Sequence, residues 1–282
     1  MKLFLTGGTG FIGSHVLAQG LAAGHRIMAL RRPGSRPRIA LTQEPFWIDG
    51  ELDGDHSGHM AGVDVFLHLA SHTPNVPYDT LERCLYWNVF ASLKLAEQAR
   101  QQGVRDFLIA GSCFEYGLAA EGQDYVHPAT ELRPISTYAI SKAAASIALL
   151  GMARQSRLRM QLLRMFQVYG EGEAKTRFWP TLRAAARSGR DFPMSTGTQI
   201  RDFVDVSTVA DQFLDAIDFR GVEAGRPQIK NIGSGIPKTL LQFAQEWWLS
   251  WGATGRLIPG QFEMRPGELG RLVANVHDVH IV

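Results

Sequence analysis

Short apolar runs alternate with helical patterns along the first half of the chain. The runs that predict strands are residues 2–5, 26–30, 46–49, 63–70 and 107–110. Apolar or alanine-rich residues at helical spacing predict helices over 14–21, 88–102 and 138–154. Alternation of strands and helices is typical of a parallel sheet that is covered on both faces. The pattern therefore predicts the α/β class with a doubly wound parallel sheet.

Composition and charge exclude several kinds of partner. The chain has 282 residues, is 20% charged and carries a net charge of only +2, which gives no reason to expect a nucleic-acid partner. It has two cysteines, so a disulfide framework is not indicated and a reducing, cytoplasmic setting is expected. No apolar stretch approaches the roughly 20 residues of a membrane span. We therefore expect neither a membrane nor a nucleic-acid partner, and we predict no metal site.

A glycine-rich turn follows the first predicted strand. Gly7, Gly10 and Gly13 punctuate the turn, and Phe11 and Ile12 begin the helical pattern that follows it. Glycines let the backbone turn tightly and let a pyrophosphate approach, while the N–H groups at the helix start face the phosphates. Strand, glycine turn and helix in this order predict a dinucleotide site.

Two arginines follow the second predicted strand. An NAD site often places an acidic residue there to accept the ribose hydroxyls, but this chain has Arg31 and Arg32, and no Asp or Glu occurs between Lys2 and Gln43. Guanidinium groups suit a 2′-phosphate, whereas a carboxylate does not. The sequence therefore favours NADP(H), with NAD as the alternative.

The ends of the predicted strands bring polar groups to one edge. Ligands of doubly wound sheets lie beyond the carboxyl ends of the strands. Gly7, Arg31, Asp49, Ala70 and Ser112 all fall at that edge. We expect them to surround a bound cofactor.

Tyr138 and Lys142 are four residues apart on a predicted helix and share one face of it. A free tyrosine has a pKa of about 10, and a nearby ammonium lowers that pKa by stabilising the phenolate. Such a pair can exchange a proton with a carbonyl or carbinol oxygen. A tyrosine and a lysine at this spacing are also common in ordinary helices. The pair therefore indicates catalysis only together with the other motifs of the chain.

The combination resembles the extended short-chain dehydrogenase/reductase family over nearly the whole chain. The features that carry the resemblance are the spacing Gly7-x-x-Gly10-x-x-Gly13, the pair Tyr138-x-x-x-Lys142, Ser112 five residues before Gly117, Asn88 at the start of a helix, His68-Leu69-Ala70, and the segment from Arg164 to Gly170. The resemblance implies a Rossmann-type fold. It also places Leu69 and Ala70 beside the nicotinamide ribose.

The resemblance also implies the catalytic roles. Hydride transfer belongs to the nicotinamide. Tyr138 would exchange the proton, Ser112 would orient the reacting oxygen, and Lys142 would hold the ribose and tune Tyr138.

Further segments are similar to the branch of that family that acts on nucleotide-linked sugars. Arg201-Asp202-Phe203-Val204 and Arg265-Pro266-Gly267-Glu268 resemble segments whose arginines grip a nucleotide diphosphate. His72 and Gln167 are further substrate-binding candidates, and Gln167 departs from the asparagine that is usual there. The expected partner is thus a nucleotide-diphosphate sugar.

The stretch after Ser112 discriminates among activities within that branch. Dehydratases place Asp and Glu in the next two positions, whereas this chain has Cys113 and Phe114, so we do not expect dehydration. In 3,5-epimerising reductases a cysteine lies one residue later than Cys113 does here. On a strand-like backbone a shift of one residue points the side chain to the opposite side. Cys113 is therefore expected to be a buried filler. Glu115 is left open between a solvated side chain and a sugar contact.

Two reactions remain. The leading prediction is NADPH-dependent reduction of the C4 ketone of a nucleotide-diphosphate 4-keto-6-deoxyhexose, in deoxysugar or polysaccharide biosynthesis. The alternative is an NAD-dependent nucleotide-sugar 4-epimerase. A non-catalytic NADP(H) sensor and a reductase of non-nucleotide ketones are less favoured, because the Ser112, Tyr138 and Lys142 set is intact and because Arg201 and Arg265 suit a diphosphate.

The domain organisation follows from the same resemblance. An NADP-binding Rossmann domain is expected over residues 1–165, with a strand near 228–232 returning to it. A smaller C-terminal substrate-binding lobe is expected over 166–282, mainly 166–205 and 236–282.

Two further expectations concern surfaces and packing. The helices predicted at 88–102 and 138–154 are expected to form a homodimer interface, as in similar proteins. Phe178, Trp179 and Phe192 are expected in the smaller lobe, where each either stacks on a ligand or, more often, packs in the core.

Overall fold

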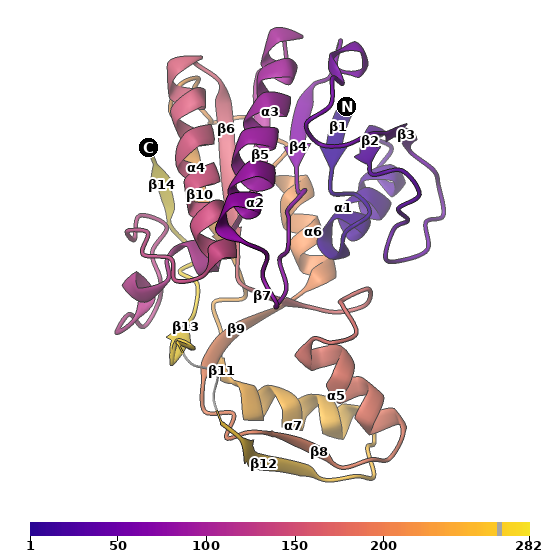
Figure 1. Cartoon of the computed structure of the whole chain (residues 1–282), viewed down its shortest axis with the longest axis vertical. Coiled ribbons are helices and arrows are strands. Elements are labelled where there is room, and N and C mark those ends of the chain that lie inside the picture. The colour runs from indigo at the N-terminus through magenta and orange to yellow at the C-terminus, as the bar shows by residue number, and fades with distance from the viewer. Residues whose placement is uncertain (264–266) are drawn as a thin grey trace.

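The computed structural model describes residues 1–263 and 267–282. Its main body is an eight-stranded sheet (Figure 1). In spatial order its strands are β14 (Val279–Ile281), β10 (Gln228–Ile232), β6 (Arg159–Met165), β5 (Asp106–Ser112), β4 (Val65–His68), β1 (Lys2–Thr6), β2 (Arg26–Arg31) and β3 (Phe46–Asp49). Strand β14 pairs antiparallel with β10, and the other neighbouring strands are parallel. The predicted doubly wound parallel sheet is confirmed.

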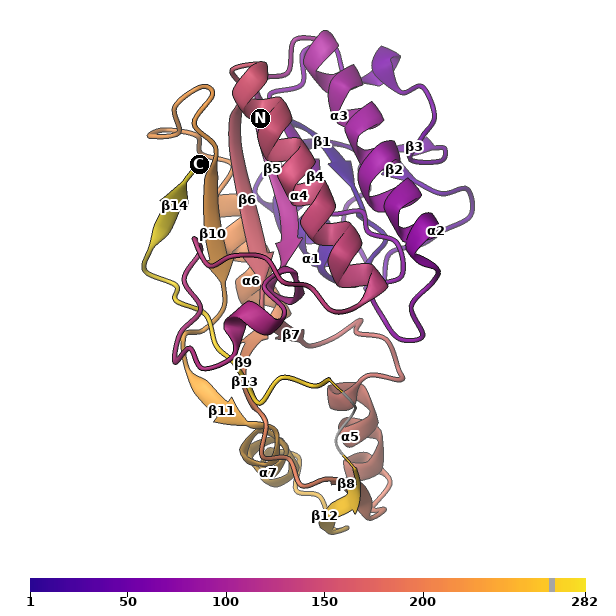
Figure 2. The same ribbon diagram turned by 60° about the vertical axis from the view of Figure 1, so that its left-hand side comes forward.

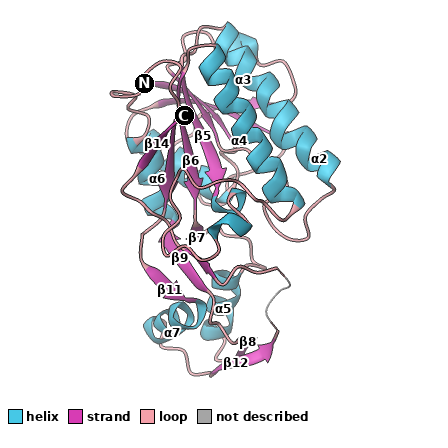
Figure 3. Ribbon diagram, turned by 90° about the vertical axis from the view of Figure 1, so that its left-hand side faces the viewer, coloured by secondary structure: helices cyan, strands magenta, loops and turns pink. Residues whose placement is uncertain are grey.

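Helices cover both faces of this sheet (Figure 3). One face carries α1 (Phe11–Ala22) and α6 (Val206–Asp215), and the other carries α3 (Ser92–Gln101) and α4 (Thr137–Gln155). Successive strand residues point to opposite faces. Leu3 and Leu5 therefore enter one hydrophobic core and Phe4 the other. Burial on both faces explains why the strands appear in the sequence as continuous apolar runs.

The helix predicted over 88–102 begins earlier than expected. Thr80 caps α2 (Leu81–Leu85), which continues through a π-helical segment (Tyr86–Ala91) into α3. The prediction that Asn88 opens a helix is therefore wrong. Asn88 lies in the π-helical segment, a type of bulge that often occurs at functional sites.

A smaller lobe lies below the main sheet (Figure 2). One sheet of the lobe contains β7 (Gln167–Tyr169), β9 (Ile200–Asp205), β11 (Pro237–Thr239) and β13 (Arg271–Leu272). A second sheet pairs β8 (Phe192–Ser195) with β12 (Leu257–Phe262). The helices of the lobe are α5 (Phe178–Arg187) and α7 (Leu240–Ser250). Phe178, Trp179 and Phe192 pack here, with the Phe178 and Phe192 ring centroids 5.7 Å apart. Three short 3₁₀ segments, Ser57–His59, Cys113–Glu115 and Leu118–Ala120, complete the elements described.

The carboxyl ends of the parallel strands face the smaller lobe (Figure 1). Thr6 at the end of β1 pairs with His68 at the end of β4, and Ser112 ends β5. The sequence-predicted site residues on these strands therefore gather at one edge. No helix among the described residues is long and apolar enough to cross a membrane.

Candidate active site

The glycine turn lies against the end of β4. Gly7 has a φ of +78°, and a Cβ atom there would lie 2.6 Å from both the Ala70 nitrogen and the Leu69 carbonyl carbon. A Cβ atom on Gly13 would collide with the Gly7 oxygen. Glycine is required at both positions because side chains would collide with backbone. The structure thus brings Leu69 and Ala70 next to the turn, and their place beside the nicotinamide ribose stays a prediction.

Helix α1 presents an uncapped N-terminus at the same edge. Gly10 occupies the N-cap position without a side-chain cap bond, and the first turn, which contains Phe11 and Ile12, holds no acidic residue. The amides and the positive end of the helix dipole are therefore available to an anion. The turn and the helix start together fit the pyrophosphate of a dinucleotide.

Arg31 and Asp49 pair with each other instead of standing apart. The Arg31 Nε lies 2.8 Å from Asp49 Oδ1, because the two residues are neighbours in the β2–β3 register. The Arg31 guanidinium also lies 4.6 Å from the centre of the Trp47 ring. Arg32 is exposed beyond the end of β2. Recognition of a 2′-phosphate by Arg31 would have to compete with Asp49.

Ser112, Tyr138 and Lys142 converge at the end of β5. Ser112 is the last residue of that strand, and the other two lie in the first turns of α4. The Lys142 Nζ donates a hydrogen bond of 2.7 Å to the carbonyl of Ala110. The Ser71 and Ser112 side chains lie close enough to Tyr138 to lower its pKa. The structure brings the three predicted catalytic residues together; their roles remain proposals.

Burial controls the ionisation of the pair on α4. It raises the pKa of Tyr138 to about 12, while the nearby Ser71 and Ser112 side chains act in the opposite direction and the charge of Glu115 adds to the rise. Burial lowers the pKa of Lys142, and Glu115 opposes that change. Tyr138 is therefore protonated at neutral pH in this structure.

His68 is a buried neutral residue beneath the site. Its ring forms hydrogen bonds with Thr6 Oγ1 at 2.8 Å and Ser92 Oγ at 3.0 Å. Burial, with a contribution from the charge of Lys142, lowers the pKa of His68 to about 3. The ring thus joins the ends of β1 and β4 to α3 rather than facing a ligand.

Glu115 matches neither of the two predictions for it, a solvated side chain or a contact with the sugar. The side chain is fully buried and is neither solvated nor able to reach a sugar. It accepts hydrogen bonds from the Ser112 N–H and from Ser146 Oγ, both at 2.8 Å, and pairs with Arg164 at 2.9 Å. The spacing Ser-x-x-Glu is that of a capping box, and this signal in the sequence was missed. Cys113 is buried, as expected, and burial raises the pKa of its thiol to about 12.

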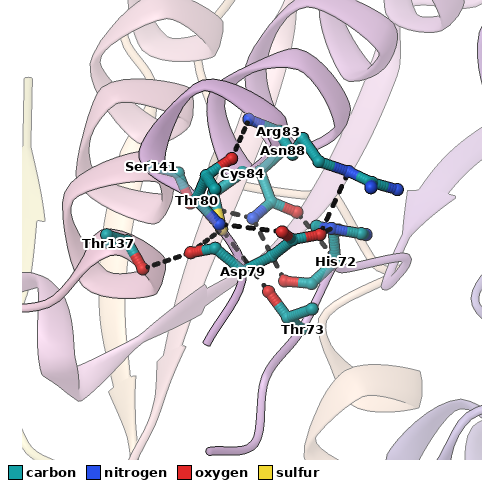
Figure 4. Close-up of polar contacts among 9 residues, drawn as sticks. All are labelled: His72, Thr73, Asp79, Thr80, Arg83, Cys84, Asn88, Thr137 and Ser141. Atoms are coloured by element: carbon teal, nitrogen blue, oxygen red, sulfur yellow. Dashed lines mark hydrogen bonds and ion pairs between the residues drawn. The ribbon is translucent and has the colours of Figure 1, made fainter. Parts of the chain in front are cut away.

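A polar network that the sequence did not reveal fixes the loop over residues 71–80 (Figure 4). The His72 N–H donates to Asn88 Oδ1 at 2.7 Å, and Asn88 Nδ2 donates to Ser141 Oγ at 2.8 Å. The His72 ring bonds Asp79 Oδ2 at 2.9 Å, and Thr137 Oγ1 donates to the Asp79 carbonyl at 2.9 Å. The loop is thereby tied to α4, and the His72 ring already has a protein partner.

The remaining substrate-binding candidates lie on the lobe side. Gln167 is partly exposed on β7, opposite Phe203 of β9. The side chain of Arg201 is only 11% exposed and pairs with Glu268 at 3.1 Å. Arg265 lies outside the described residues.

Comparison of the sequence with known protein families identifies the family of this chain. The model of the NAD dependent epimerase/dehydratase family matches residues 3–233. The chain belongs to that family. This membership confirms the predicted resemblance to extended short-chain dehydrogenase/reductases.

Relatives of this chain include proteins named as sugar-nucleotide enzymes. It is 26% identical over 299 residues to the UDP-glucose 4-epimerase of Corynebacterium glutamicum, covering 98% of this chain and 87% of that protein. It is similar to a solved structure of MoeE5 in complex with UDP-glucose and NAD, with 27% identity, a TM-score of 0.83, and coverage of 98% and 90%. The UDP-N-acetylglucosamine 4-epimerase of Methanobrevibacter ruminantium M1 shares the fold, with a TM-score of 0.87 at 22% identity and coverage of 98% and 89%.

Proposed function

We propose that the protein is a nucleotide-diphosphate-sugar 4-epimerase with NAD as its cofactor. Convergence of Ser112, Tyr138 and Lys142 beside the glycine turn carries the proposal. The activity and ligands of the relatives support the same reaction and substrate class. This choice reverses the order of the two reactions that the sequence left open, because 4-epimerases recur among the relatives.

Each residue of the trio has a chemical task. The Tyr138 hydroxyl exchanges a proton with the oxygen on C4 of the sugar. The Ser112 Oγ accepts the N–H of Phe114 at 3.3 Å, and its hydroxyl hydrogen is the one that would be donated to the C4 oxygen of the bound sugar. A bound nicotinamide supplies the hydride acceptor and donor.

The ionisation of Tyr138 suits one direction of the reaction directly. With a pKa of about 12, its hydroxyl is protonated and can donate a proton to an alkoxide at C4. The opposite direction needs the phenolate, which the positive charge of Lys142 on the same helix face stabilises. Tyr138 and Lys142 thus act as one proton-exchanging unit.

The chain lacks the side chains for dehydration next to Ser112. Phe114 has no transferable proton, and the Cys113 thiol stays protonated because burial raises its pKa to about 12. Elimination of water requires a second acid–base pair near the sugar. Its absence from residues 113–114 favours epimerisation over dehydration.

NADPH-dependent reduction of a 4-keto-6-deoxyhexose nucleotide is the second candidate. Arg31 and Arg32 at the end of β2 favour it, since they suit a 2′-phosphate. The ion pair between Arg31 and Asp49 weighs against it, because it occupies one of the two guanidinium groups.

Several narrower assignments belong to this proposal. Gln167, Arg201, Arg265 and His72 are proposed to contact the substrate, with Arg201 exchanging Glu268 for the diphosphate. A homodimer through α3 and α4 is also proposed, and exposed Phe90 before α3 and Ile147 on α4 support it.

Product analysis tests the proposal. The purified protein is incubated with UDP-glucose and other nucleotide sugars, and the products are identified by NMR. A 4-epimerase forms the C4 epimer without consuming added cofactor. Turnover of a 4-keto sugar only with NADPH would instead establish the reductase. Denaturation of the purified protein should release NAD if the epimerase assignment is right.

A further inference from the structure

A buried ion pair lies directly beneath the proposed reaction centre. The Glu115 and Arg164 side chains are 0% and 2% exposed, and their charged atoms are 2.9 Å apart. Removing two charges from water costs so much that a buried pair adds little net stability. We therefore look for the role of the Glu115–Arg164 pair in the groups that it holds in position.

The two carboxylate oxygens of Glu115 join three elements. Oε1 accepts the N–H of Ser112 at the end of β5. Oε2 accepts the hydroxyl of Ser146 on α4 and the Nε of Arg164 on β6. The strand end that carries Ser112 and the helix that carries Tyr138 thus meet at one carboxylate.

Arg164 is in turn held by its surroundings. Its Nη1 donates to the Pro128 carbonyl at 3.2 Å, and its guanidinium lies 4.7 Å from the centre of the Tyr116 ring. The Tyr116 hydroxyl donates to Asn231 Oδ1 at 2.6 Å. Glu115 therefore sits against a fixed support rather than a mobile side chain.

We propose that Glu115 is a positioning residue of the reaction, whose carboxylate sets the place of Ser112 relative to the helix that carries Tyr138 and Lys142. The inference rests on the proposed function for its catalytic consequence. Misplacement of reacting groups by about 1 Å can cost about 100-fold in rate. A bond from the carboxylate to the Ser112 amide is suited to prevent that misplacement.

A second ion pair, between the first residues of β5 and β6, provides a control. Asp106 and Arg159 are neighbours at the starts of the parallel strands β5 and β6. Two hydrogen bonds of 2.6 and 2.7 Å join their side chains. This pair also ties β5 to β6, but it lies at the far end of the strands from Ser112. A purely structural role would make the two pairs equivalent in their effect on the reaction.

The charge of Glu115 gives the proposal an independent readout. It acts on both Tyr138 and Lys142 and raises the pKa of each. The other groups that act on Tyr138 are Ser71, Ser112 and Cys113, and Lys142 shares its helix face. Removing the charge of Glu115 should therefore lower the pKa of Tyr138.

The test compares three variants with the parent. The paired change Glu115→Leu with Arg164→Met removes both charges together, Glu115→Asp keeps the charge but withdraws the carboxylate, and Asp106→Asn is the control. Kinetics of epimerisation, exchange of the Ser112 amide hydrogen, and ultraviolet titration of tyrosinate are measured. Subtracting the titration of each protein carrying Tyr138→Phe isolates Tyr138.

We expect a split between rate and binding. The paired variant should lose about 30-fold or more in kcat, and Glu115→Asp about tenfold, with KM changed by less than about threefold. Ser112 amide exchange should accelerate in both, and Tyr138 should titrate at lower pH in the paired variant only. Asp106→Asn should match the parent in kcat, Ser112 exchange and Tyr138 titration.

Equal kcat, equal Ser112 exchange and an unshifted Tyr138 titration in the paired variant would overturn the proposal. So would losses of kcat in Asp106→Asn as large as those in Glu115→Asp. If the paired variant fails to fold, Glu115→Asp decides through kcat and Ser112 exchange. If the parent turns over no nucleotide sugar, the proposed function fails, and unchanged Ser112 exchange and Tyr138 titration would still reject the positioning role.

Discussion

The rings of Tyr78 and Tyr138 lie nearly parallel, with their centroids 5.7 Å apart and their planes 16° from one another. Tyr78 belongs to the loop that Asp79 ties to Thr137. A residue outside the predicted catalytic set therefore shields the ring that is proposed to exchange the proton. This shielding belongs to the burial that raises the pKa of Tyr138 to about 12.

Replacing Tyr78 by alanine should hydrate Tyr138. Because burial is the main cause of the raised pKa, Tyr138 should then titrate closer to its usual pKa of about 10. The pH dependence of kcat should shift to lower pH in Tyr78→Ala, whereas Tyr78→Phe keeps the ring and should behave like the parent. Identical pH–rate profiles for Tyr78→Ala and the parent would show that the stacked ring has no influence on Tyr138.

His68 should make the fold sensitive to acid. Its folded pKa of about 3 lies below its usual value of 6.5, so the neutral ring stabilises the fold above pH 6.5, and this contribution is lost as the pH falls towards 3. His68→Gln should cost about 1–3 kcal/mol at neutral pH through lost hydrogen bonds. Urea unfolding at a series of pH values should show a steeper decline for the parent than for His68→Gln.

A matched control for this experiment is His277→Gln, because His277 is exposed. That variant should decline with falling pH as steeply as the parent does. Parallel stability curves for the parent and His68→Gln would mean that His68 does not carry the acid sensitivity.

The ion pair between Arg31 and Asp49 should govern cofactor choice. Asp49→Asn releases the guanidinium of Arg31, so NADP should bind more tightly relative to NAD than it does in the parent. Arg31→Ala should weaken NADP by about tenfold and leave NAD within about threefold, because a hydrogen bond to a charged group contributes about 1.5–3 kcal/mol. Calorimetric titration with both cofactors measures this. If Arg31→Ala leaves the ratio of the two affinities unchanged, Arg31 does not read the 2′-phosphate.

The sequence predicted those parts of the molecule that depend on local pattern. Runs of buried residues located the strands, and the glycine turn located the edge where Gly7 meets Ala70. These features follow from backbone geometry and from the rule that parallel strands end at one edge. The convergence of Ser112 with Tyr138 came from the family resemblance rather than from the pattern itself.

Pairings between distant residues were not predictable in the same way. Glu115 finds Arg164, and Arg201 finds Glu268, only once the fold brings them together. From the sequence alone, the side chain of a glutamate that follows a strand can be solvated, contact a ligand or pair with a buried residue. Which of these occurs depends on the residues that the neighbouring strands bring near it. The π-helical position of Asn88 likewise depends on packing against α4, where its side chain meets Ser141.

The most direct test follows a deuterium atom on C4 of UDP-glucose. The proposed epimerase removes and returns that atom at one site, so NMR and mass spectrometry should show the C4 epimer with deuterium still on C4. Tyr138→Phe should bind the same substrate but form product at least about 100-fold more slowly. Absence of the epimer, or equal rates for the parent and Tyr138→Phe, would contradict the account.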